Sequence, residues 1–73
     1  MTPERRAEIL SKDVITIKEL GELLNLGYQM AAQKMRDMRR GLQAEGRDKL
    51  NIRGKVLVED YAYYYGLNLN RNS

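Results

Sequence analysis

Two amide and two guanidinium side chains recur near the middle of the chain, at intervals of four, three and four residues. They belong to Gln29, Gln33, Arg36 and Arg40. Residues at this spacing share one face of an α-helix. Glutamine can form two hydrogen bonds with adenine, and arginine can do the same with guanine or bind a phosphate. The chemistry that this pattern offers is therefore hydrogen bonding to bases and phosphates.

An apolar series runs through the same segment at the same intervals. It consists of Ala31, Met35, Met38 and Leu42. The two series start two residues apart, which is roughly 200° around a helix, so they lie on opposite faces. We expect a helix from about Tyr28 to about Leu42 that packs through its apolar face and leaves its polar face outside. An ordinary solvated helix is the alternative for that polar face.

Other site chemistry is scarce in this sequence. The chain has no Cys and no His, which excludes disulfides, the usual zinc sites and the commonest general acid or base at neutral pH. The six glycines are scattered and form no phosphate-binding loop. The carboxylate pairs Glu19/Glu22 and Glu59/Asp60 are explained by helix starts and solvated faces. We therefore expect a protein that is not an enzyme and that uses no cofactor, metal or small-molecule substrate.

The positive charge is concentrated in the middle of the chain. The formal net charge is +3, yet residues 27–55 alone carry eight basic and three acidic side chains, a net +5. Such clustering is typical of proteins that bind nucleic acids. A basic but merely solvated helix face would give the same count.

The 73 residues suffice for one domain, which we place at residues 1–67, with residues 68–73 as a flexible polar tail. A domain of this size buries only about 60% of its unfolded surface and has no room for a deep substrate cleft. No apolar run is long enough to cross a bilayer, and the N-terminus lacks the apolar stretch of a signal peptide. These features predict a cytoplasmic protein that does not bind membranes.

Two further helices are expected before residue 28. Thr2 and Pro3 can start a short helix that ends near Leu10 and exposes Arg5 to water. Thr16-Ile17-Lys18-Glu19 is a capping box, in which the Thr hydroxyl and the Glu carboxylate each accept a hydrogen bond from a free amide. The second helix continues to Leu24, and Asn25-Leu26-Gly27 ends it because Asn and Gly tolerate left-handed backbone.

A hairpin and a closing helix are expected after residue 49. Residues 50–52 and 55–58 read as its two strands, and Gly54 supplies the positive φ of the turn. A last helix would start at Glu59 and end at Gly66. Tyr61, Tyr64 and Tyr65 would lie on or near its inner side, and Tyr63 would face water. The chain is thus predicted to be α+β, a small winged helix-turn-helix with three to four short helices and a β-hairpin wing.

In a helix-turn-helix the second helix enters the major groove of DNA, with its N-terminal half nearest the bases. Gln29 and Gln33 are the candidate base readers, while Arg39 and Arg40 would reach phosphates. The predicted DNA-binding residues of this helix are Tyr28, Gln29, Gln33, Lys34, Arg36, Arg39 and Arg40. Those of the wing are Arg53, Gly54 and Lys55. The alternative for the wing is that Gly54 serves the turn and the charges keep an edge hairpin soluble.

Residues 13–66 resemble the excisionase-like, MerR-type winged helix-turn-helix proteins of phages and integrative mobile elements. The resemblance is carried by Val14-Ile15-Thr16, the run Thr16-Ile17-Lys18-Glu19-Leu20-Gly21-Glu22-Leu23-Leu24, a turn, a basic helix, Lys55-Val56-Leu57-Val58 and a closing aromatic helix. It implies a protein that binds repeated DNA sites cooperatively, bends them and directs an integrase toward excision, or that regulates transcription. Relatives of this type often carry Ala at the position of Gly21, and a Ser or Thr cap where this chain has Gly27-Tyr28. The choice between Gln29 and Gln33 as base reader therefore stays open.

Three functions compete on this reading. The first is sequence-specific binding of double-stranded DNA, as an excisionase or small transcriptional regulator whose partners include an integrase or recombinase and further copies of the chain. The second is a protein-interaction module whose basic helix docks on a recombinase or replication protein. The third is binding of RNA or single strands through the tyrosines, in which Tyr63 would matter most.

Overall fold

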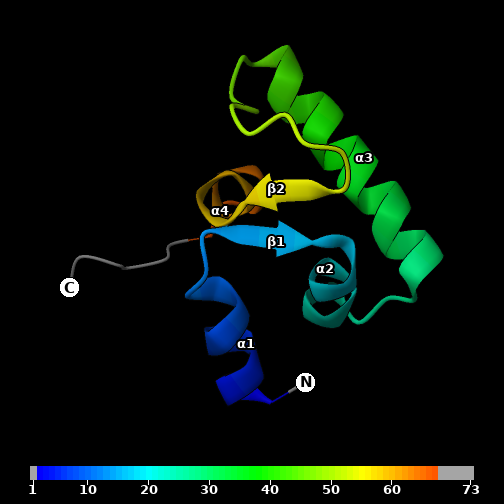
Figure 1. The fold of residues 1–73 in the computed structure, drawn as a ribbon, viewed down its shortest axis with the longest axis vertical. Helices are drawn as coiled ribbons and strands as arrows, with labels where there is room; N and C mark the ends of the chain where they lie inside the picture. Colours follow the sequence, from blue (N-terminus) through cyan, green and yellow to red (C-terminus); the bar gives the residue numbers. More distant parts are fainter. Residues whose placement is uncertain (1, 68–73) are drawn as a thin grey trace.

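The computed structural model describes residues 2–67 and shows a small α+β fold (Figure 1). Within that range the elements are α1 (Pro3–Leu10), β1 (Val14–Thr16), α2 (Ile17–Leu24), α3 (Tyr28–Ala44), β2 (Lys55–Leu57) and α4 (Val58–Tyr65). The predicted α+β class is confirmed, and the arrangement is consistent with a small winged helix-turn-helix. The tail predicted at residues 68–73 lies outside the described residues.

The sheet joins two segments that are far apart in the sequence. β1 and β2 are antiparallel, with Val14 opposite Leu57, Ile15 opposite Val56 and Thr16 opposite Lys55 (Figure 1). Ile15 and Val56 are both fully buried, so this pairing places two β-branched residues in the core.

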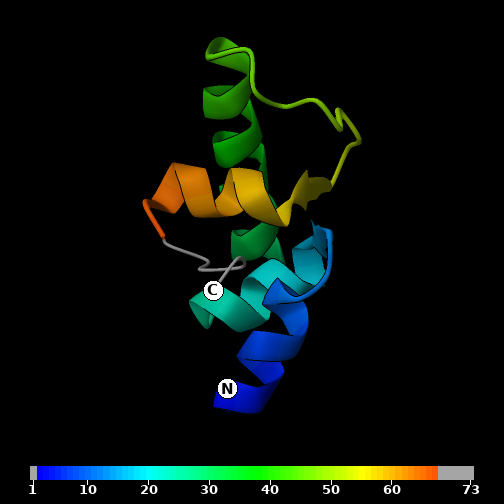
Figure 2. The same cartoon turned by 90° about the vertical axis from the view of Figure 1, so that its left-hand side faces the viewer.

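The strand predicted at residues 50–52 is wrong, and so is the extension of the second strand to Val58, where α4 already begins. Asn51 has a left-handed backbone, with φ of 48°, which a strand does not accommodate. Ile52 is 45% exposed and would bring little apolar surface to a pairing. Residues 45–54, here called the wing loop, instead connect the end of α3 to β2 (Figure 2).

The predicted helix caps are present. The Thr2 hydroxyl accepts a hydrogen bond from the backbone N–H of Arg5 at 3.1 Å. In the capping box the Thr16 hydroxyl accepts from the N–H of Glu19 at 3.3 Å, and the Glu19 carboxylate accepts from the N–H of Thr16 at 3.0 Å. Asn25 ends α2 in the left-handed conformation. These local signals define where α1 and α2 begin and where α2 ends.

The core lies between α3, α2 and the sheet. All four residues of the predicted apolar series in α3, Ala31, Met35, Met38 and Leu42, are buried. Met35, Met38 and Leu42 meet Leu20 of α2, Val56 of β2 and Tyr61 of α4 in one cluster. Full burial of each large apolar side chain stabilises the fold by about 1.5–3 kcal/mol, so this cluster holds α3 against the rest of the chain.

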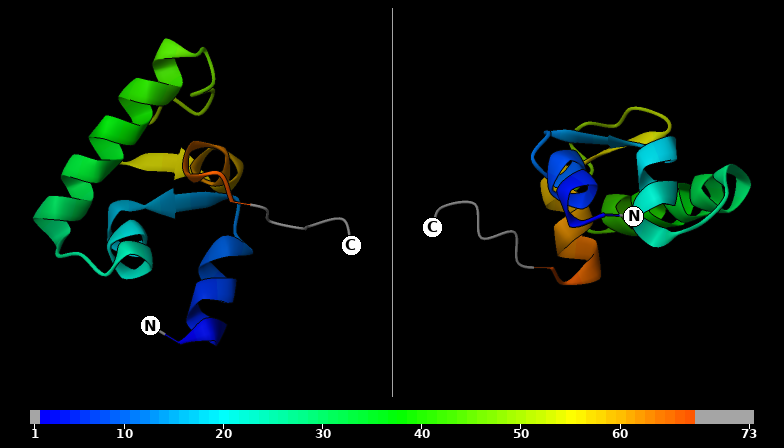
Figure 3. Two further views of the ribbon diagram at one scale, coloured as in Figure 1. Left: turned by 180° about the vertical axis from the view of Figure 1, so that it is seen from behind. Right: turned by 90° about the horizontal axis from the view of Figure 1, so that it is seen from below.

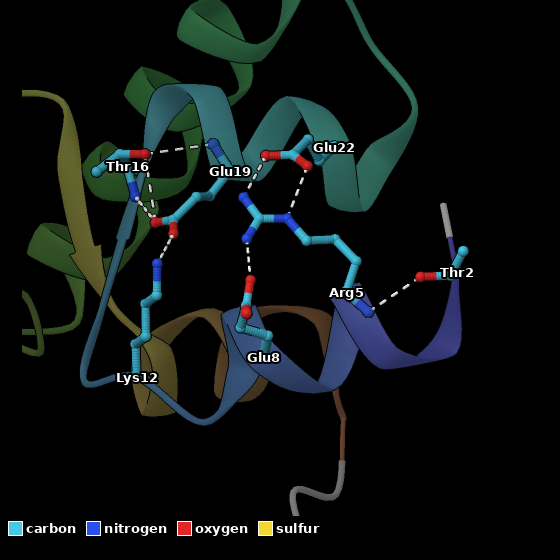
Figure 4. A network of polar contacts seen from close by, with 7 residues as sticks. All are labelled: Thr2, Arg5, Glu8, Lys12, Thr16, Glu19 and Glu22. Atoms are coloured by element: carbon cyan, nitrogen blue, oxygen red, sulfur yellow. Dashed lines mark hydrogen bonds and ion pairs between the residues drawn. The ribbon is translucent and has the colours of Figure 1, made fainter.

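Ion pairs join α1 and the residues that follow it to α2 (Figure 4). The Arg5 guanidinium donates from Nε and Nη2 to the two carboxylate oxygens of Glu22, each at 2.9 Å, and it also contacts Glu8. The Lys12 ammonium lies 2.6 Å from the Glu19 carboxylate. The prediction that Arg5 faces water is therefore wrong, because a bidentate carboxylate lies within its reach.

The last helix differs from its prediction in which tyrosines are buried. Tyr61 is 4% exposed and belongs to the core, whereas Tyr64 and Tyr65 are 42% and 38% exposed. The expectation that all three lie on or near the inner side is confirmed for Tyr61, whereas Tyr64 and Tyr65 lie near it but are exposed. They follow the buried residues at the start of an eight-residue helix, and Tyr65 packs edgewise on Tyr64 and at a tilt on Tyr61. Tyr63 is exposed as predicted.

Candidate nucleic-acid interface

The turn between α2 and α3 brings the two helices close together. Asn25 is left-handed, and the backbone N–H of Leu26 donates to the carbonyl oxygen of Gly21 at 2.8 Å. A Cβ on Gly21 would lie 2.9 Å from the carbonyl oxygen of Leu26 and 3.3 Å from Cβ of Ala31. This close approach gives a physical reason for Gly at this position.

The outer face of α3 presents the predicted polar series to solvent. Six of its seven predicted DNA-binding residues are exposed: Tyr28, Gln29, Gln33, Lys34, Arg36 and Arg40. Tyr28 is the most exposed of the large hydrophobic side chains in the described part of the chain, at 66%. Figure 3 shows that α2 lies between α3 and α1, so α1 does not cover this outer face. The prediction that the polar and apolar series lie on opposite faces of α3 is confirmed.

Arg39, the seventh predicted residue, points toward the wing loop. Its side chain is 14% exposed, its Nε donates to the Asp48 carboxylate at 3.0 Å, and its Nη2 donates to the Asn51 side-chain oxygen at 3.2 Å. The Asp48 side chain is fully buried and also accepts from Gln43 Nε2 at 2.9 Å and from the Asn51 N–H at 3.3 Å. Arg39 therefore fixes the wing loop to α3.

These contacts decide the protonation of Asp48. Burial by itself would raise the pKa of the Asp48 carboxyl. The hydrogen bonds from Gln43, the Asn51 backbone and Arg39 outweigh burial and lower the pKa below its usual value. Asp48 is thus an ionised, fully paired carboxylate at neutral pH.

The wing loop ends in a tight turn at residues 52–55, here called the wing turn. The N–H of Lys55 donates to the carbonyl oxygen of Ile52 at 3.2 Å, and Gly54 has φ of 76°, as predicted. Arg53 and Lys55 are exposed on either side of Gly54. A Cβ on Gly54 would lie 3.3 Å from Cδ1 of Ile17, so the turn rests on the first residue of α2.

A groove runs between the wing turn and α3, which lie side by side in Figure 1. Its lining is Ile17, Ala32, Met35, Arg36, Arg39, Arg53 and Gly54. The structure thus brings together two predicted arginines of the helix, Arg36 and Arg39, with Arg53 and Gly54 of the predicted wing. Gln29, Gln33, Lys34, Arg40 and Lys55 do not line this groove.

Three residues of the site were not predicted from the sequence. Asp48 and Asn51 give no sequence signal, because the fold alone brings them to their partner in α3. The third is Lys18, which is exposed on α2 and lines a shallow hollow with Tyr28 at the α2–α3 turn. The first helix of a helix-turn-helix crosses the DNA backbone, and a lysine in its first turn is a signal that could have been used.

The far end of the wing loop is held by a separate cluster. The Arg47 guanidinium lies over the Tyr63 ring, 3.8 Å from its centroid, and Nη2 lies 3.7 Å from the Asp60 carboxylate. The Tyr63 hydroxyl donates to the Glu45 carboxylate at 2.7 Å. Burial raises the pKa of Asp60 above its usual value, more than Arg47 lowers it. This cluster joins the wing loop to α4.

Comparisons of the chain with known protein families, with curated protein sequences and with solved structures give no match. Across residues 2–67, no helix has the length and apolar character needed to cross a membrane. No group of three His, Cys, Asp or Glu side chains in the same residues is placed to hold a metal ion.

Proposed function

We propose that this chain binds double-stranded DNA by inserting α3 into the major groove, with the wing turn against the adjoining backbone. The observation that carries the proposal is the outer face of α3, where Gln29, Gln33 and Arg36 are exposed while the opposite face is buried in the core. A helix has the width of the major groove, and amide and guanidinium groups match the edges of adenine and guanine. Arg53 extends the basic surface beyond α3.

The residues divide by their expected contacts. Gln29 and Gln33 lie in the first half of α3 and would read bases, and Arg36, beyond them, would reach the DNA backbone. Arg40 lies one turn further on and would reach a phosphate. The second half of α3 lies farther from the bases than the first half, so its cations cannot all contact bases at once.

We further propose that this binding serves excision of a mobile element or regulation of its transcription. This part rests on the resemblance of residues 13–66 to excisionase-like proteins. On this proposal the chain acts in the cytoplasm as a binding protein and not as an enzyme, and its partners are DNA, an integrase or recombinase, and neighbouring copies of itself on DNA.

The direct experiment is a titration of short random-sequence duplex DNA with the purified chain at about 50 and 200 mM salt, because phosphate contacts release counterions and weaken with salt. Selection of preferred sequences from the bound fraction follows. Duplex binding that falls with salt and enriches a motif supports the proposal. No duplex binding at the lower salt would reject it and would favour the protein-docking function for the basic face.

A further inference from the structure

The groove between α3 and the wing turn has the charge of an anion site. Three of its seven lining residues are arginines, and no carboxylate lines it. The carboxylate of Asp48 neutralises one of them, Arg39, from the side of the wing loop. Among residues 2–67, no ion pair or hydrogen bond engages the guanidinium of Arg36 or Arg53. Two cations from separate elements therefore line one groove without an internal partner.

The size of the groove suits a small anion. Its volume is about 180 Å³, and its apolar lining comes from Ile17, Ala32 and Met35. At about 30 Å³ for one water molecule, this volume holds a phosphate group and several waters. Gly54 has no side chain to fill the opening beside Arg53. An apolar lining lowers the local dielectric and strengthens the attraction of an anion to the guanidiniums.

We propose that this groove binds one phosphodiester group of a DNA backbone, held jointly by Arg36 from α3 and Arg53 from the wing turn. Guanidinium groups match phosphate oxygens with paired hydrogen bonds. Because the two arginines come from different elements, one phosphate between them would fix the position of the wing turn relative to α3. The inference rests on the proposed DNA binding and adds to it a defined contact shared by two residues.

Asp48 acts in this site as a positioning residue. It has no place in the groove lining, yet it holds Arg39 at one wall and, through the Asn51 N–H, the segment that leads to Arg53 at the other wall. Loss of its charge would make the chain more positive overall. The groove account nevertheless expects weaker binding to DNA, because the two walls lose their common support.

The test compares two double-variant cycles on a short random-sequence duplex. Arg36→Gln and Arg53→Gln are combined in the first cycle, and Arg40→Gln and Arg53→Gln in the second. Arg40 is an exposed arginine of α3 outside the groove, so the charge changes are matched. A shared phosphate predicts that the first double variant binds little worse than either single variant, and that the slope of log affinity against log salt falls by about 0.9 only once. The second cycle should show multiplied losses.

A second measurement needs no DNA. Inorganic phosphate is titrated into the labelled chain while the Nε–Hε signals of its arginines are followed by NMR. The signals of Arg36 and Arg53 should shift together and saturate, those of Arg6 and Arg40 should not, and the response of Arg36 should weaken in Arg53→Gln. Asp48→Asn should weaken both this response and duplex affinity.

The outcomes separate the two proposals. Phosphate shifts at Arg36 and Arg53 without duplex binding would support the anion site and reject DNA as its source. Duplex binding with multiplied losses in both cycles, and no paired phosphate shifts, would overturn the groove site and leave the proposed function standing.

Discussion

The Nε of Arg39 lies 3.0 Å from a carboxylate oxygen of Asp48, and this pair joins the middle of α3 to the wing loop. The Asp48 side chain is fully buried, and the Arg39 side chain is nearly so. Arg39, which was predicted from the sequence to bind DNA, thus serves mainly to hold the wing loop in place. The same pair brings one wall of the arginine-lined groove into place.

Asp48→Asn should lower the free energy of unfolding at neutral pH by about 1–3 kcal/mol, because the donors on Arg39 and Gln43 lose a charged acceptor. The measurement is urea denaturation. Asp37→Asn is the matched control, since Asp37 is an exposed aspartate of α3 and its replacement should change stability by no more than about 0.5 kcal/mol. Equal stabilities of the two variants would show that the wing loop does not depend on Asp48.

The pH dependence should have opposite signs at the two buried aspartates. The pKa of Asp48 is lowered, so its contribution to stability is complete above the usual value of 3.8 and is lost as the pH falls through the lower folded pKa. The stability difference between the natural chain and Asp48→Asn should therefore be largest at neutral pH and should close in acid.

Asp60 should behave in the opposite way. Burial raises its pKa, so the ionised form disfavours the folded state at neutral pH, and this cost is relieved as the pH falls from the raised pKa toward 3.8. Asp60→Asn should stabilise the fold at neutral pH, and the gain should disappear in acid. Thermal unfolding across this range checks both signs, and a loss of stability in Asp60→Asn at neutral pH would show that its pairing with Arg47 dominates.

Gly21→Ala should destabilise the fold by about 1–3 kcal/mol, since the added Cβ would lie 2.9 Å from the Leu26 carbonyl oxygen and force the α2–α3 turn to shift. Gly27→Ser is the contrast. Nothing lies within 4 Å of a Cβ there, and α3 has no side-chain cap, so Ser should be neutral or stabilise by about 0.3 kcal/mol. Unfolding midpoints of the two variants decide the matter, and a neutral Gly21→Ala would mean that the turn adapts freely.

Tyr63→Ala should leave duplex affinity within about twofold of the natural chain, because Arg47 covers one face of the ring and the hydroxyl donates to Glu45. It should lower stability modestly by loosening the far end of the wing loop. Titrations with a duplex and with the corresponding single strand test this. A large loss confined to the single strand would revive the view that the exposed tyrosines stack on unpaired bases.

The sequence predicts well what neighbouring residues determine. The caps at Thr2 and Thr16, the left-handed stop at Asn25, the two faces of α3 and the positive φ of Gly54 all depend on contacts within a few residues. Each of these signals acts within its own helix or turn, so it can be recognised in the sequence without knowledge of the fold.

What could not be predicted depends on contacts between distant segments. Val56 pairs with Ile15, about forty positions earlier, and nothing in residues 50–58 indicates that partner. The turn around Gly54 and the strand that follows it are typical of a local hairpin. The segment before the turn, however, forms no strand. Likewise, the pairing of Arg39 with Asp48 depends on how the wing loop folds back. The helical spacing alone therefore cannot distinguish Arg39, which is paired, from Arg36 and Arg40, which are exposed.

The central claim is that the outer face of α3 binds DNA, and the most direct measurement is the affinity of two charge-matched variants for the same duplex. Arg36→Ala removes a cation from that face, and Arg6→Ala removes one from the exposed surface of α1, beyond α2 (Figure 3). The account predicts that Arg36→Ala weakens binding by about fivefold or more, a cost of about 1–3 kcal/mol, and that Arg6→Ala changes it by less than about twofold. Equal losses in the two variants, or none in Arg36→Ala, would contradict it.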